Sequence, residues 1–184
     1  MTLDPFLRAY RYRKLEKGEE YATDWFRTKA LSGPNNSWVA YSAFDNREFE
    51  LLWLVPDNDE NWLLRAEGAA FQGGVSGECR DRLLAHFRDP KTPAPYPIYG
   101  LYLMGEASEE KLLEVATTAD RRCEVALMMG IRAAGERRLA DSSAWLRASL
   151  KTGQSGNVAY NRAAGLLKRW DTQRFGVPGG ADIP

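Results

Sequence analysis

Apolar residues recur at helical spacing along most of the chain, most clearly near its carboxyl end. Between residues 157 and 170, apolar side chains fall at i, i+4, i+7, i+8 and i+11; they are Ala159, Ala163, Leu166, Leu167 and Trp170. This spacing places all of them on one face of an α-helix. Shorter segments with the same periodicity are bounded by Gly, Pro, Asn and Asp, so the sequence predicts an all-α fold of helices of about 10 to 15 residues.

Capping and turn residues divide the chain into successive predicted helices. Asp4-Pro5 opens the first, which runs to Gly18, and Asp120 is expected to cap the helix that carries Cys123, Leu127 and Ile131. The other expected helices cover 19–31, 38–44, 47–55, 60–72, 76–86, 98–104, a segment after Ser108, 139–150 and 157–170. The segments 38–44 and 47–55 are also compatible with strands on composition alone. We expect one domain over residues 1–174 and a flexible tail over 175–184.

Charge and hydropathy argue against two classes of partner. The 25 basic and 25 acidic side chains give a net charge of zero, which removes the general attraction to nucleic acids and anionic membranes. The segment from Arg8 to Lys14 mixes basic and aromatic residues, but acidic residues follow directly and favour an amphipathic helix. No apolar run approaches the roughly 20 residues of a membrane span, and no secretory signal is evident, so we expect a soluble cytoplasmic protein.

Sites for a metal, a cofactor or catalysis are not evident in the sequence. The two cysteines, Cys79 and Cys123, lie 44 positions apart without a CxxC motif, and His86 is the only histidine. Cys79 and His86 share a helix face as a possible thiol–imidazole pair, but they start roughly 10 Å apart and no third orienting residue is evident. The glycines from 68 to 77 lack the pattern of a phosphate-binding loop. We therefore expect no cofactor and no enzymatic activity.

A 34-residue period relates two prolines in the middle of the chain. Pro56 and Pro90 are 34 positions apart. Between them, Trp62, Gly73 and Ala85 occupy the places of a first-helix tryptophan, an inter-helix glycine and a small residue in the second helix. This segment resembles a tetratricopeptide repeat, and the proline-rich stretch 90–97 separates it from the helix predicted over 98–104.

A second segment, residues 123–153, resembles a carboxy-terminal unit of the same family. Its matching positions are Gly130 in the first helix and Trp145, Leu146 and Ser149 in the second. It departs from the pattern at the turn, where Arg137 stands in place of the usual glycine and Gly135 comes two residues early. The resemblance covers residues 56–174, whereas residues 1–55 match only in being helical.

The resemblance implies a right-handed solenoid of antiparallel helix pairs whose concave face binds peptides or proteins. In this register the concave positions are Glu60, Leu63, Glu67 and Ala70 in the first unit and Glu124, Leu127, Ile131 and Ala134 in the second. They do not reproduce the lysine and asparagine clamp that family members use for a terminal carboxylate. We expect a non-catalytic adaptor, or a regulator such as an immunity-type inhibitor. The alternative is a small helical enzyme or ligand-binding protein with a pocket among its Trp and Tyr residues.

Overall fold

The computed structural model describes residues 5–31 and 36–175, with side chains over 7–29 and 39–170. Within these ranges it is all-helical, with ten α-helices, one 3₁₀ helix and no strand. The all-α class is therefore as predicted. The predicted cap at Asp4 and residues 176–184 of the predicted tail lie outside the described residues. Phe175, which was predicted to begin the tail, is instead the last residue of α10.

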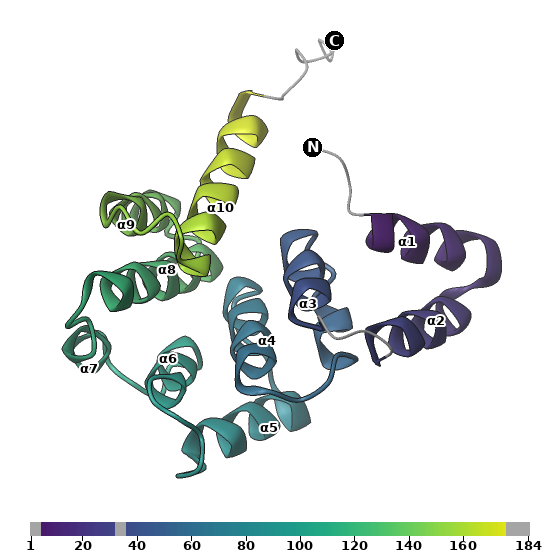
Figure 1. Cartoon of the computed structure of the whole chain (residues 1–184), viewed down its shortest axis with the longest axis horizontal. Coiled ribbons are helices and arrows are strands. Elements are labelled where there is room, and N and C mark those ends of the chain that lie inside the picture. The colour runs from purple at the N-terminus through teal and green to yellow at the C-terminus, as the bar shows by residue number, and fades with distance from the viewer. Residues whose placement is uncertain (1–4, 32–35, 176–184) are drawn as a thin grey trace, which may run out of the picture. The chain divides into compact units, whose positions relative to one another are not determined.

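Backbone contacts divide the chain into two compact units, Met1–Ser108 and Glu109–Pro184. The first contains α1 (Pro5–Lys17), α2 (Glu19–Leu31), α3 (Asn36–Asp45), the 3₁₀ helix η1 (Phe49–Trp53), α4 (Asp59–Phe71), α5 (Gly77–Arg88) and α6 (Tyr96–Leu103). The second contains α7 (Glu109–Glu114), α8 (Ala119–Gly135), α9 (Leu139–Lys151) and α10 (Val158–Phe175) (Figure 1). The sequence-based expectation of one domain over residues 1–174 stays a prediction.

The first unit begins with a hairpin of α1 and α2. Gly18 joins the two helices with φ of +88°, a backbone conformation that glycine adopts at little cost. Leu7 and Tyr10 of α1 are buried together with Ala22 and Phe26 of α2. The rings of Tyr10 and Phe26 meet edge to face with centroids 5.6 Å apart, which is a preferred aromatic geometry. These four side chains therefore form the hairpin's core.

In the rest of the first unit, α4 and α5 pack against α6, and α3 and η1 pack against α4. Asn58 caps α4 by accepting a hydrogen bond from the backbone N–H of Asn61. Helix α6 contacts both α4 and α5. It lies so close to α5 that a Cβ atom at Gly100 would stand 2.3 Å from the Phe87 ring. Ala85 is exposed, so its predicted role as the small contact residue of α5 is wrong. The close contact instead joins Phe87 to a glycine of the next helix.

The second unit is built on an antiparallel hairpin of α8 and α9 (Figure 1). Near the open end, the Ser149 hydroxyl donates to the Cys123 carbonyl oxygen at 3.0 Å. Near the turn, a Cβ atom at Gly130 would stand 2.8 Å from Cδ2 of Leu146. The predicted small residues at 130 and 149 and the predicted large residue at 146 are therefore confirmed as contacts between these helices.

The turn between α8 and α9 contains Arg137 in the left-handed region, with φ of +61°. Its N–H donates to the Ala134 carbonyl oxygen, and the N–H of Arg138 donates to the Ala133 carbonyl oxygen. Glycine usually occupies this position after a helix. The turn thus has the left-handed geometry of a glycine-terminated helix although an arginine occupies the position. Helix α10 follows and packs against both α9 and α8.

Two local predictions need correction. Asp120 does not cap α8, because the Thr118 hydroxyl accepts the N–H of Arg121 at 3.2 Å. The segment 47–55 forms only the short helix η1, and Arg47 before it has φ of +60°. That conformation is unfavourable inside an α-helix for a residue with a Cβ atom, so the helical segment cannot extend from 47 as predicted.

Candidate functional site

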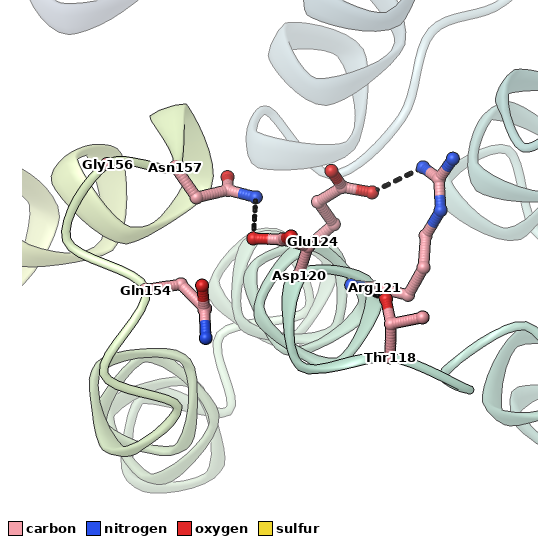
Figure 2. Close-up of a pocket in the computed structure, with 7 residues that line it drawn as sticks. All are labelled: Thr118, Asp120, Arg121, Glu124, Gln154, Gly156 and Asn157. Atoms are coloured by element: carbon pink, nitrogen blue, oxygen red, sulfur yellow. Dashed lines mark hydrogen bonds and ion pairs between the residues drawn. The ribbon is translucent and has the colours of Figure 1, made fainter.

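The second unit contains an open, polar recess between the start of α8 and the segment that joins α9 to α10 (Figure 2). Its volume is about 670 Å³. The lining residues are Thr118, Asp120, Arg121, Glu124, Gln154, Gly156 and Asn157. All of them are exposed or half-buried. We refer to this feature as the α8 recess.

The fold of the hairpin explains why these side chains meet. Asp120 and Glu124 are one turn apart on α8, so they lie on the same face. Helix α10 brings Asn157 to that face, and its amide nitrogen donates to Oδ1 of Asp120 at 3.3 Å (Figure 2). Carboxylates in the first turns of a helix are also stabilised by the helix dipole. Stabilisation of α8 therefore explains why carboxylates occur at this end of the helix.

The recess also contains a cation. Nη1 of Arg121 lies 2.7 Å from Oε2 of Glu124, as Figure 2 shows. With Asp120, these groups leave the lining with one formal negative charge at neutral pH. The amide groups of Gln154 and Asn157 add donors and acceptors. The arrangement suits a ligand group that donates hydrogen bonds and carries positive charge.

The six partner-binding residues predicted from the sequence are divided equally between the two units. Glu124 lines the α8 recess. Glu60 and Leu63 are half-buried in α4, in the other unit, where Glu60 accepts a hydrogen bond from the Tyr41 hydroxyl.

The other three predicted residues are buried, and their exposure on a concave face needs correction. Leu127 is 1% exposed and Ile131 is 0% exposed. Leu127 falls on the stripe of α8 that includes Cys123 and Gly130, and this stripe faces α9. Glu67 is also 0% exposed, because α3, η1 and α6 all pack against α4. The concave positions predicted from the repeat register required an open helix face, but neighbouring helices cover that face.

The recess residues other than Glu124 were not identified as a site from the sequence. Asp120 was recognised only as a capping candidate, and Asn157 only as the start of the last predicted helix. The carboxylates at i and i+4 are visible in the sequence as a local signal. Their approach to Asn157 depends on the packing of α10 against α8, which local sequence patterns do not specify.

The first unit contains a second cluster, in which two arginines lie over two tryptophans. The Trp53 and Trp62 rings meet edge to face at 6.2 Å. The Arg65 guanidinium carbon lies 4.5 Å from the Trp62 ring centroid, and that of Arg82 lies 5.2 Å from the Trp53 centroid. These distances are within the range of cation–π attraction. The sequence left open a ligand pocket among the Trp and Tyr residues. In this cluster, however, guanidinium groups already lie over the indole rings.

Arg65 is the buried member of this cluster. Its side chain is 1% exposed. It donates to the carbonyl oxygens of Leu52 and Val55 at 2.8 and 2.6 Å, and to Oδ1 of Asp57 at 2.6 Å. Burial lowers the pKa of Arg65, and the hydrogen bond to Asp57 opposes this shift. These contacts tie η1 and the segment after it to α4, so Arg65 has a structural role.

His86 and Cys79 both lie in α5 but have different surroundings. The His86 ring stacks on Trp62 with centroids 4.8 Å apart and an interplanar angle of 14°. Cys79 is half-buried and is a free thiol. No described contact joins the two side chains. Catalysis by this pair therefore gains no support from the structure.

Within the described ranges, no three or more His, Cys, Asp and Glu side chains gather in a way that could hold a metal ion. The part of the chain that the structure describes also has no helix with the length and hydropathy needed to cross a membrane. In comparisons with protein-family models, curated proteins and solved structures, no match to the chain was found.

Proposed function

We propose that the protein is a non-catalytic protein-interaction module and that its partner binds at the α8 recess. The observation that carries the proposal is the recess itself, an open volume of about 670 Å³ whose polar side chains come from the start of α8 and from the segment between α9 and α10. Open polar recesses on a rigid helical support are suited to anchoring a side chain of another protein.

The hairpin below the recess supports a repeat-like architecture similar to the tetratricopeptide family. It combines close helix contact at Gly130, a buried Ser149 and a left-handed residue at the turn. The following helix, α10, packs on both members of the pair, as the first helix of a next repeat would. We propose this architecture for residues 119–175.

The lining favours a basic anchor residue from the partner. Asp120 and Glu124 offer carboxylate oxygens, and Gln154 and Asn157 offer amide oxygens. An arginine or lysine side chain donates several hydrogen bonds and carries the complementary charge. A phosphate-bearing ligand would instead face two carboxylates and a single guanidinium, that of Arg121, which is already paired with Glu124. We therefore favour a protein with an exposed basic side chain over a nucleic acid.

A small polar ligand is the second candidate for the same recess. The volume falls within the range of about 300–1,000 Å³ that small-molecule sites usually have. Those sites, however, are mainly apolar and bury most of their ligand, whereas the side chains of this recess are polar and partly exposed. This difference ranks the small ligand below a protein partner.

Two parallel experiments separate these candidates. Affinity capture from cells of the source organism, read by quantitative mass spectrometry, should recover a partner with the wild-type chain and lose it with Asp120→Lys/Glu124→Lys. A library of polar metabolites should leave the thermal midpoint unchanged, because a ligand that binds only the folded state would raise it. A metabolite that stabilises the wild type but not the double variant would favour the small-ligand candidate.

A further inference from the structure

A ring stack joins α4 and α5. Helix α6 packs extensively against both helices, whereas α4 and α5 touch each other much less. Across this limited contact, His86 of α5 lies flat on Trp62 of α4, and Trp62 is only 9% exposed. His86 also meets Phe87 edge to face at 5.0 Å. The imidazole is therefore well placed to hold α5 against α4.

The surroundings of His86 do not provide a hydrogen bond for its Nε2 atom. Nε2 is buried and has no hydrogen-bond partner among the described residues. The nearest carboxylate oxygen, Oδ1 of Asp59, is 3.4 Å away but without hydrogen-bond geometry. A proton added to the ring would thus create a partly buried cation with one incompletely formed ion pair.

The charged groups around His86 act in opposite directions. Asp59 from α4, Asp57 just before it and Asp89 just after α5 favour protonation, whereas Arg65 from α4 opposes it. Arg65 already lies over the same indole, 4.5 Å from the Trp62 centroid. Arg82 lies one turn before His86 and 5.7 Å from that centroid. Helix α6 has no charged residue.

We propose that His86 is an acid-sensitive latch: its neutral ring holds α5 on α4, and protonation loosens that contact. The chain has no other histidine, so the latch has a single proton-binding group in this range of pH. Loosening would affect the first unit, and the proposal is independent of the function assigned to the α8 recess.

The direction of the pKa agrees with this geometry. Burial lowers the pKa of His86 below its ordinary value near 6.5, and it outweighs the attraction of the aspartates. The folded state therefore takes up a proton less readily than an opened state does. The stability contributed by the neutral ring is fully present above about pH 6.5 and is lost as the pH falls from there toward the lowered pKa.

The test follows the single imidazole by NMR in the full-length chain. We expect its titration midpoint below 6.5. The hydrogen-exchange protection factors of α5 amides should fall through the same range, by about tenfold for each unit that separates the midpoint from 6.5. In His86→Gln these protection factors should not change with pH between 7.5 and 5.

Asp59→Asn provides a second variant that keeps the stack. Removing this carboxylate should lower the midpoint further, because Asp59 favours the charged ring. A wild-type midpoint at or above 6.5 would overturn the proposal. So would α5 protection factors that stay constant in the wild type, or that change equally in His86→Gln.

Discussion

Gly130 of α8 lies so close to Leu146 of α9 that a Cβ atom at position 130 would stand 2.8 Å from Cδ2 and 2.9 Å from Cγ of the leucine. Real side chains essentially never come this close. The hairpin under the α8 recess therefore depends on the absence of a side chain at this position, and a substitution there must displace Leu146 or the helices themselves.

Gly130→Ala should destabilise the protein relative to Gly165→Ala. Alanine gains roughly 1 kcal/mol of helix propensity over glycine at either position. At Gly165 a Cβ atom meets only Nη2 of Arg169 at 3.9 Å, so the gain should be kept. At Gly130 the overpacking of Leu146 should cost about 1–3 kcal/mol. Denaturant unfolding of both variants measures the difference, and equal stabilisation would contradict the close contact.

Arg137→Gly should stabilise the turn between α8 and α9. Left-handed backbone costs a residue with a Cβ atom about 1–2 kcal/mol. Glycine avoids this cost, but part of the gain is lost because glycine gives up more conformational entropy on folding. The net gain should be about 0.5–1 kcal/mol. Arg137→Val should have the opposite sign, because a β-branched residue is strongly disfavoured at positive φ. Thermal unfolding checks the order of the three proteins; a Val variant as stable as the Gly variant would refute it.

Arg65→Met should be strongly destabilising, whereas Arg82→Met should change stability by less than about 0.5 kcal/mol. The two arginines lie over the same two indoles, but only Arg65 is buried and holds two backbone carbonyl oxygens. Removing it leaves those acceptors without a partner, at a cost of about 3–5 kcal/mol. The comparison is made by urea unfolding. Similar losses in both variants would show that cation–π contact, and not the hydrogen bonds, dominates.

Glu106 should contribute to the acid sensitivity of the first unit. Its carboxylate accepts hydrogen bonds from Arg80 and Arg88 of α5, and these bonds lower its pKa below the ordinary value near 4.3. The folded state binds a proton at Glu106 less readily than the unfolded state does. The stability contributed by the ionised Glu106 is therefore present above about pH 4.3 and is lost as the pH falls through the lowered pKa. Glu106→Gln should therefore have a lower thermal midpoint than the wild type at pH 6, and the gap should close toward pH 3.

Glu114→Gln is the control for this measurement. Glu114 is exposed in α7 and has no ion pair among the described residues. Glu114→Gln should therefore have a thermal midpoint close to that of the wild type at every pH. If the difference in thermal midpoint between Glu106→Gln and the wild type does not change with pH, the ion pairs of Glu106 do not cause the acid sensitivity.

The helices could be predicted from the sequence because their signals are local. Periodic apolar residues and the breaks at Gly18, Pro56 and Gly73 set most boundaries within a few residues. The contacts within residues 123–153 were also predictable, since both partners belong to one hairpin with a short turn. Arg137 shows that a turn geometry can be kept where the expected glycine is absent.

The pairing of α4, α5 and α6 could not be predicted in the same way. The 34-residue spacing suggested Ala85 as the close contact of α5, but the side chain that packs is Phe87 and its small partner, Gly100, lies in the next helix. The buried positions of Glu67, Leu127 and Ile131 were missed for a related reason. Periodicity identifies an apolar face, but it does not show how many neighbouring helices cover the rest of the cylinder.

The dissociation constant of the captured partner shows whether the partner binds at the α8 recess. It should be measured for the wild type, for Asp120→Lys/Glu124→Lys and for the matched charge control Glu109→Lys/Glu114→Lys in α7, with circular dichroism to show that all three remain helical. The account predicts at least about tenfold weaker binding for the recess variant, equivalent to about 1.4 kcal/mol, and near wild-type binding for the α7 control. Equal dissociation constants for the recess variant and the wild type would contradict binding at the α8 recess.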